Sequence, residues 1–455
     1  MRSNYFQRLA TCAFLLLILL GCSIRSNVFN TLFLRANDNL HFEGRWLLNH
    51  NQDSAISDWP CSAFRFRVRV GDPAKTTVRL VWYGLRTRIL VRIDAGNGVS
   101  EEKIYSGPST VLVWWKSSTS ISFPSEGDFD ISVHKLTTAA PFGMGIGGDV
   151  LKPSKLEIYG VQIGGTAIHL PVDNPPPLRF DIIGASDTAG YCVDGTPETV
   201  QTSYILEGWK YENCYRTSGS VLAQGFNAQV NYQAASGMGL TQNAMASQEW
   251  QLGPLSMPDY INRTLMTDKT SLWPYSEHPA PDLVLVSLGG NDYNHQGDNV
   301  PSDAEFNAAY EKLLLQLFMH YGVVNEDKTI GQGKIPKIVS ICGQGSPNEG
   351  TDQNRCRPCP HVEGAVQKFQ ENNAGDMAIA VDYIFIPCDG SVVTGIDDIG
   401  CNGHKNALGQ LQIANYLEPR LKAIMNWTNT DSNVLRAPYF DSLEETVHVR
   451  SAVRG

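Results

Sequence analysis

The sequence predicts a chain in two parts, an all-β sandwich followed by an α/β domain in which helices cover a parallel sheet. Between about residues 40 and 165, short runs alternate apolar and polar residues, as strands with one buried face do. After the stiff segment DNPPP at 173–177, longer apolar runs alternate with helical patterns. The 455 residues, 42% hydrophobic and 18% charged, suffice for more than one globular domain.

The expected sandwich covers residues 35–170. Its strands are separated by Gly, Pro, Ser and Asp, with no helical pattern between them, which is typical of a β-sandwich. Arginines on alternate positions of the first long strand are interpreted as a solvated face rather than a ligand site. The predicted strands include AFRFRVRV, TTVRLVWYG, RILVRIDAG, STVLVWW, FDISVHKL and KLEIYGVQI.

The expected α/β domain covers residues 176–430. SDAEFNAAYEKLLLQLFMHYG begins with a capping-box spacing, Ser302 to Glu305, and continues with apolar residues at helical spacing. ALGQLQIANYLEPRLKAIM is expected to be the last helix, and residues 431–455, which lack a clear pattern, are expected to be a disordered tail. The apolar runs expected to form the parallel sheet are RFDIIG, QVNYQAA, DLVLVSLGG, KIVSICG and AIAVDYIFI.

Residues 1–22 have the layout of an export signal. Arg2 and Arg8 precede the apolar run AFLLLILL, which is too short to span a bilayer, since a spanning helix takes about 20 residues. We therefore expect a secreted protein. The ending LLGC at Cys22 also resembles a bacterial lipoprotein cleavage site, and only a lipid there would bind the protein to a membrane. N-glycosylation sequons at Asn262 and Asn426 favour instead a eukaryotic secreted glycoprotein.

Four residue types that can do ester chemistry stand at the predicted strand ends. Active residues of parallel sheets lie in loops at the carboxyl ends of the strands. Ser186 follows the first strand, Gly237 the second and Asn291 the third, while His404 precedes the last helix. Each alone reads as a turn, a helix cap or a surface residue. Together, in this order, they indicate a catalytic site.

These blocks resemble those of the SGNH (GDSL-type) hydrolases. The matching stretches are GASDTAGY around Ser186, SGMG around Gly237, GGND around Asn291 and NGHKN around His404. The sequence is most similar to carbohydrate esterase family 2, a resemblance that SDWPCSAFRF, GYCVDG and MPDYINRTL extend over about residues 40 to 428. It implies a three-layer SGNH domain with a five-stranded parallel sheet, preceded by a jelly-roll sandwich.

The resemblance implies a serine esterase that needs no cofactor. His404 would take the proton of the Ser186 hydroxyl, which then attacks the ester carbonyl. The N–H of Ser186, the N–H of Gly237 and the side-chain amide of Asn291 would form the oxyanion hole. Water, again activated by His404, would hydrolyse the acyl-serine.

The group that orients the histidine departs from the family pattern. Related sequences often carry Asp two or three residues before the histidine, where this chain has Asn402 and Cys401. Asn402 can accept from the imidazole but cannot stabilise an imidazolium by charge. Alternatively, Asp397 or Asp398 folds back, or a carbonyl orients the imidazole of a Ser–His dyad. Two further departures are Ala185, where the family has Asp, and Lys405, where it has Pro.

The cysteines indicate disulfides. Of ten cysteines, two lie in or beside the export signal, and the remaining eight would be oxidised outside the cell. We expect the bridges Cys192–Cys214 and Cys388–Cys401, because each pair flanks a short loop near the candidate site. CRPCPH, with Cys342, is also compatible with a zinc knuckle, but export argues against it, and we expect no metal site.

The sequence thus predicts a secreted carbohydrate O-acetylesterase acting on polysaccharides such as xylan or mannan. Tyr191, Tyr293 and Trp250 are candidate stacking faces for sugars. We expect a monomer whose partner is an acetylated polysaccharide or oligosaccharide. Nucleic acid is excluded because the net charge is −10 and no basic tract occurs.

Two alternatives remain. In the first, the chain is a carbohydrate-binding or surface protein whose site has decayed, as Ala185, Asn402 and Lys405 suggest; the intact Ser186 and the other three blocks count against it. In the second, it is a lipase or phospholipase of the same superfamily, which the lack of a long apolar lid disfavours.

Overall fold

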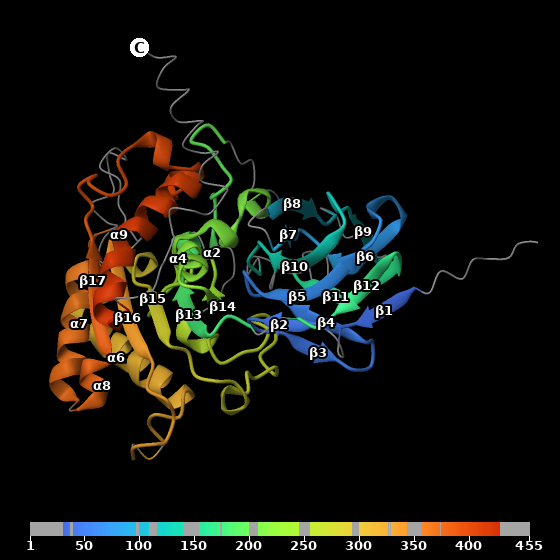
Figure 1. Cartoon of the computed structure of the whole chain (residues 1–455). Coiled ribbons are helices and arrows are strands. Elements are labelled where there is room, and N and C mark those ends of the chain that lie inside the picture. The colour runs from blue at the N-terminus through green and yellow to red at the C-terminus, as the bar shows by residue number, and fades with distance from the viewer. Residues whose placement is uncertain are drawn as a thin grey trace, which may run out of the picture.

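The computed structural model describes residues 31–36, 40–96, 100–108, 116–139, 154–172, 175–199, 208–244, 255–293, 300–325, 327, 329–343, 356–373 and 375–427. The predicted export signal, the strand at STVLVWW, Trp250 and the tail lie outside these ranges. Figure 1 shows two parts side by side, a sandwich of mostly blue to green strands and an α/β layered part.

The first part is a sandwich of two antiparallel sheets. One has the order β3 (Leu47–Asn49), β4 (Ser54–Ser57), β11 (Leu156–Gly165), β6 (Thr76–Gly84) and β9 (Ser117–Ile121), with β1 (Leu32–Arg35) paired to β11. The other has the order β12 (Ala167–Leu170), β5 (Ala63–Val70), β10 (Gly127–Lys135), β7 (Arg88–Asp94) and β8 (Ser100–Ser106), with β2 (His41–Glu43) paired to β5.

Alternation along β5 explains why these strands form a sandwich. Phe64, Phe66 and Val68 are buried in the core between the sheets. The intervening arginines point the other way and form ion pairs: Arg65 with Glu43 at 2.6 Å and Arg69 with Asp128 at 2.6 Å. Arg69 is exposed, as a solvated face predicts, but Arg65 is half-buried.

The second part is a parallel sheet between two helical layers, as the sequence predicted. Among the described residues its five strands have the order β14 (Ala228–Ala234), β13 (Leu178–Gly184), β15 (Leu283–Ser287), β16 (Lys337–Gly343) and β17 (Val381–Ile386). The described helices are α2 (Ser186–Ala189), α4 (Ser218–Gly225), α6 (Asp303–His320), α7 (Cys359–Asn372), α8 (Asp376–Ile379) and α9 (Ala407–Met425).

Successive residues of each strand point to opposite helical layers. Ile183 packs in one core with α6 and α7, whereas Ile182 packs in a second core with α4 and α9. The α6 capping box forms as predicted, with the Glu305 N–H donating to Ser302 Oγ. The short helix α4 and helix α7 were not predicted. No helix in the described ranges has the length and apolar character needed to cross a membrane.

The strand register gathers the predicted site residues at one edge of the sheet. Gly184 of β13 pairs with Ala234 of β14 and with Ser287 of β15. Ser186, Gly237 and Asn291 therefore follow neighbouring strands at the same level. We call this region, together with the loop that carries His404, the carboxyl edge.

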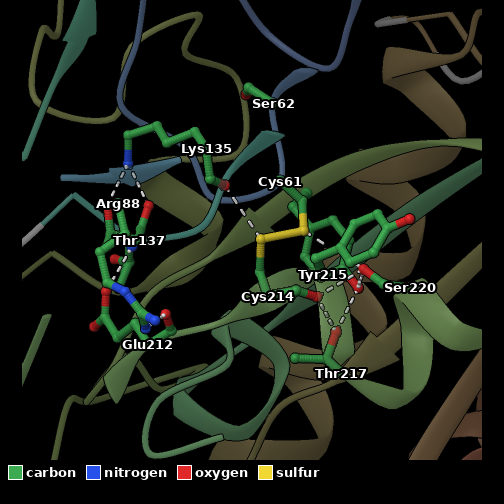
Figure 2. The surroundings of a disulfide bond; sticks show 12 residues. Cys61, Ser62, Arg88, Lys135, Thr137, Glu212, Cys214, Tyr215, Thr217 and Ser220 are labelled. Atoms are coloured by element: carbon green, nitrogen blue, oxygen red, sulfur yellow. Dashed lines mark hydrogen bonds between the residues drawn. A yellow bond between two sulfur atoms is a disulfide. The ribbon is translucent and has the colours of Figure 1, made fainter. Parts of the chain in front are cut away.

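The two parts meet at a surface that we call the domain seam. The disulfide Cys61–Cys214 crosses it, with both cysteines buried (Figure 2). From the sandwich side, the buried Arg45 donates to the carbonyls of Ile261 and Arg263 at 2.6 and 2.7 Å. These contacts fix the sandwich on the α/β part.

Buried charges face one another across the domain seam. The Asp58 carboxylate accepts from the Met266 N–H at 2.8 Å. Lys135 Nζ donates to the Thr137 carbonyl (Figure 2) and to the Asp58 carbonyl at 3.1 Å. Glu212 accepts from the Thr138 N–H at 2.8 Å. Burial lowers the pKa of Lys135 to about 8 and raises that of Glu212 to about 7.

The expected disulfide pairing is wrong. Each of the four predicted cysteines is bonded, but the pairs are Cys61–Cys214, Cys192–Cys401, Cys342–Cys359 and Cys356–Cys388. The predicted pairs, Cys192–Cys214 and Cys388–Cys401, assumed that bridges close short loops. In the fold, Cys214 instead faces the sandwich, and Cys192 faces the loop before α9, because sheet topology rather than chain distance sets their neighbours.

Candidate active site

Ser186 sits on a tight turn between β13 and α2. A Cβ on Gly184 would lie 2.1 Å from Thr188 Oγ1, so only glycine allows α2 to fold back this closely over the strand end. Gly190 ends α2 with φ 86°, a left-handed conformation that glycine adopts without strain. The turn leaves the Ser186 side chain partly exposed at the carboxyl edge.

His404 contacts Ser186 directly. Its Nε2 lies 2.7 Å from Ser186 Oγ, and its Nδ1 lies 3.0 Å from the backbone oxygen of Asn402. A carbonyl oxygen can only accept, so Nδ1 carries the proton and Nε2 is free to accept from the serine hydroxyl. The pair has the geometry of a nucleophile beside its base.

The orienting group is the Asn402 main chain rather than its side chain. Asn402 and Gly403 have positive φ angles, 53° and 71°, which turn the Asn402 carbonyl toward the imidazole. The Asn402 side chain donates instead to the Tyr191 hydroxyl at 2.8 Å. Asp398, one of the proposed carboxylates, accepts from the N–H and hydroxyl of Thr394. Of the alternatives the sequence left open, the structure therefore fits the carbonyl-oriented dyad.

The proposed sugar-stacking role of Tyr191 and Tyr293 is wrong, because these residues are only 3% and 2% exposed. The Tyr191 ring meets the His404 ring edge-on, with centroids 4.7 Å apart. The Tyr293 ring stacks on the partly exposed ring of His361. Trp250, the third candidate, lies outside the described residues.

The glycine and asparagine blocks are held together by a residue that the sequence reading missed. The buried Asp292 carboxylate accepts from the N–H groups of Leu240, Thr241 and Gln242. Burial raises the pKa of Asp292, which these hydrogen bonds oppose. Asp292 is the last residue of the GGND block, directly after Asn291, and this position was the sequence signal for its role.

Asp292 thereby holds the loop that follows Gly237 close to its own neighbour in the chain, Asn291. Gly237 has φ 79°, which suits glycine, and Asn291 Nδ2 donates to the Met238 carbonyl at 2.7 Å. This bond sets the plane of the Asn291 amide. The described residues thus present a backbone N–H and an amide side chain on adjoining, rigid loops.

The alternative of a zinc knuckle at CRPCPH, which the sequence disfavoured, does not fit the structure. Cys342 is bonded to Cys359, and Cys356 to Cys388, so their sulfurs are disulfides and not thiolate ligands. His361 lies beside Asp303, with Nδ1 3.4 Å from the carboxylate. In the part of the chain that the structure describes, no group of three or more His, Cys, Asp or Glu side chains has metal-site geometry.

The jelly-roll sandwich, the five-stranded parallel sheet and the serine–histidine pair at its carboxyl edge define an SGNH-type hydrolase fold with an N-terminal β-sandwich. Solved structures share it. A family two carbohydrate esterase from Clostridium thermocellum, in complex with cellohexaose, is 19% identical, covers 86% of this chain and 100% of its own, and has a TM-score of 0.64. An acetyl xylan esterase from the rumen bacterium Butyrivibrio proteoclasticus is 14% identical, with coverages of 89% and 100% and a TM-score of 0.64.

A sequence relative points the same way. The chain is 31% identical, over 274 residues, to the cellulase/esterase CelE of Acetivibrio thermocellus. The match covers 60% of this chain but spans only 29% of the length of CelE. No protein-family model matches the chain. At the level of fold, the predicted likeness to carbohydrate esterase family 2 is confirmed.

Proposed function

We propose that this protein is a secreted serine esterase that removes acetyl groups from polysaccharides. The observation that carries the proposal is the pair of contacts around His404: Nε2 at 2.7 Å from Ser186 Oγ and Nδ1 at 3.0 Å from the Asn402 carbonyl. A serine hydroxyl becomes a useful nucleophile only when a base takes its proton. The carbonyl fixes the imidazole in the tautomer that can do so.

The reaction runs in two halves. The Ser186 oxygen attacks the acyl carbonyl while its proton moves to His404 Nε2, and the negative charge that develops on the carbonyl oxygen is stabilised by the N–H groups of Ser186 and Gly237 and the amide of Asn291. The imidazolium then protonates the leaving sugar oxygen. Water, deprotonated by the same nitrogen, releases acetate from the acyl-serine.

The substrate class rests on the comparisons. The curated relative carries the name cellulase/esterase, and the structural neighbours are carbohydrate esterases, one an acetyl xylan esterase. Their names support a carbohydrate ester as the substrate of this chain. Secretion is supported by the layout of residues 1–22, and the sequons at Asn262 and Asn426 support a glycoprotein.

The test is release of acetate from an aryl acetate and from acetylated xylan by wild type and Ser186→Ala. We expect wild type to release acetate from both and Ser186→Ala to lose this activity, with an unchanged melting temperature. Equal rates for the two proteins would overturn the proposal and favour the binding-protein alternative. Faster cleavage of long-chain than of acetyl aryl esters would favour a lipase instead.

A further inference from the structure

The residues directly after Ser186 and His404 are bonded to one another. Lys405 Nζ lies 3.1 Å from Asp187 Oδ2, and the Lys405 N–H donates to Asp187 Oδ1 at 3.2 Å. The loop of the nucleophile and the loop of the base are 218 residues apart in the chain. One carboxylate therefore holds both the main chain and the side chain of the residue that follows the base.

This ion pair is buried at its positive end. The Lys405 side chain is 1% exposed, whereas that of Asp187 is 27% exposed. An ammonium group loses its hydration when it is buried, and it is tolerated only with a well-placed partner. Lys405 also stands where the resembling family has proline, a residue without a side-chain charge or an N–H. Proline could make neither of the two contacts that Lys405 makes with Asp187.

A buried amide extends the link into the helical layer. Gln410 of α9 donates from Nε2 to the Asp187 carbonyl at 3.1 Å, and its Oε1 accepts from the Ser218 N–H at 2.9 Å. The backbone of Asp187 is therefore tied to α9 and α4, and its carboxylate to Lys405. These bonds leave the nucleophile turn little freedom relative to the loop that carries His404.

We propose that the Asp187–Lys405 ion pair is the positioning element that sets the Ser186 Oγ to His404 Nε2 separation. The inference rests on the proposed Ser–His chemistry and adds a role for two residues that do not touch the reacting atoms. Proton transfer needs hydrogen-bond distance, and a displacement of about 1 Å can cost about 10²-fold in rate.

Lys405→Met, Asp187→Asn and the double variant test this role. With a small aryl acetate, we expect each single variant to lower kcat about 10- to 100-fold with KM nearly unchanged. The double variant should be slower than wild type, because the link between the two loops is lost. It should be no slower than the slower single variant, because neither charge of the pair remains. In Lys405→Met, the Asp187 carboxylate has lost its ammonium partner and favours the imidazolium, so the acid limb of the kcat/KM profile should move to higher pH and return in the double variant.

Other titratable groups around the imidazole are unchanged in these variants. Among them is Tyr191, whose ring edge faces His404, and Asp398 in the preceding turn also keeps its charge. Lys337→Met is the matched control, because it breaks an ion pair with Asp382 at the opposite, amino edge of the sheet. It should keep the wild-type kcat and acid limb.

A substrate-independent readout separates this inference from the proposed function. The rate at which a fluorophosphonate labels Ser186 reports how well His404 activates it, whatever the natural ester. Slower labelling of Lys405→Met and Asp187→Asn supports the positioning role even if acetyl esters prove poor substrates. A correctly folded Asp187→Asn with the labelling rate and kcat of wild type would overturn the positioning role. If Lys405→Met fails to fold, wild-type values in the double variant would do the same. A wild type that the probe does not label would also overturn it.

Discussion

The domain seam and the carboxyl edge both consist of buried polar groups around a disulfide, but they hold different things. At the seam, Arg45 and Asp58 bond to the backbone of the other part of the molecule, so they join the two parts. At the carboxyl edge, Asp292 and Asp187 bond within and between short loops, so they place single side chains. Similar chemistry therefore serves stability in one region and reactive geometry in the other.

If this comparison holds, changes at the seam alter the free energy of unfolding and leave kcat intact, whereas changes at the carboxyl edge lower kcat. Removing the seam disulfide with Cys61→Ala/Cys214→Ala should have the largest effect. The bridge joins residues 153 apart in the chain, and the chain-entropy argument gives about 5 kcal/mol for a loop of this size. Urea unfolding should show the loss, while kcat at 25 °C stays at the wild-type level.

The second bridge provides the control for that experiment. Cys192 and Cys401 flank Tyr191 and Asn402, which contact the His404 ring. Their double alanine variant should lose both stability and kcat. If the seam variant lost as much kcat as the Cys192→Ala/Cys401→Ala variant, the two regions would not differ in the way proposed.

Asn291→Ala should give the next largest effect, and only on catalysis. Removing one preorganised donor of an oxyanion hole typically lowers kcat about 10²- to 10³-fold. The Asn291 side chain also bonds to the Met238 carbonyl, but Asp292 still holds the same loop through its own hydrogen bonds. The melting temperature should therefore stay unchanged. A fall in melting temperature with kcat retained would mean that Asn291 is structural only.

The sequence predicted the repeated, local features of this molecule well. The strands β13 to β17 follow from apolar runs, and α6 from its capping box and apolar spacing, since these patterns lie in neighbouring residues. The order of the four blocks also predicted that Ser186 and His404 lie close together, because parallel strands end at one edge of the sheet.

What the sequence did not predict depends on contacts between distant residues. The pairing of Cys192 with Cys401 and of Lys405 with Asp187 is set by how loops cross the carboxyl edge, which no local pattern records. The carbonyl that orients His404 is a main-chain group, so residue type at position 402 carries no direct information on it. Burial of Tyr191 and Tyr293 likewise follows from packing and not from residue type.

Glu212→Gln should change the pH dependence of stability at the seam by a smaller amount. Burial raises the pKa of Glu212 from its ordinary value of 4.5 to about 7. Between these pH values the folded state binds more protons at this site than the unfolded chain, so the site's contribution is complete below pH 4.5 and is lost as pH rises through 7. Gln keeps the acceptor for the Thr138 N–H but does not titrate.

The measurement is urea unfolding of both proteins from pH 4.5 to pH 7. Wild type should lose stability with rising pH relative to Glu212→Gln, and kcat should be equal in the two proteins at each pH. Parallel stability profiles would show that Glu212 stays ionised in the folded protein, compensated by the buried Lys135.

Arg69→Met should have the smallest effect and tests whether burial, not contact distance, decides what an ion pair contributes. Arg69 lies 2.6 Å from Asp128, closer than the 2.8 Å between Arg88 and Asp194 at the seam. The Arg69 side chain is 59% exposed and that of Arg88 11%. Water and salt screen the first pair, so its loss should leave the melting temperature unchanged. Arg88→Met removes this partner of Asp194 and should lower the melting temperature. Equal melting temperatures for the two variants would mean that the seam gains nothing from its buried charges.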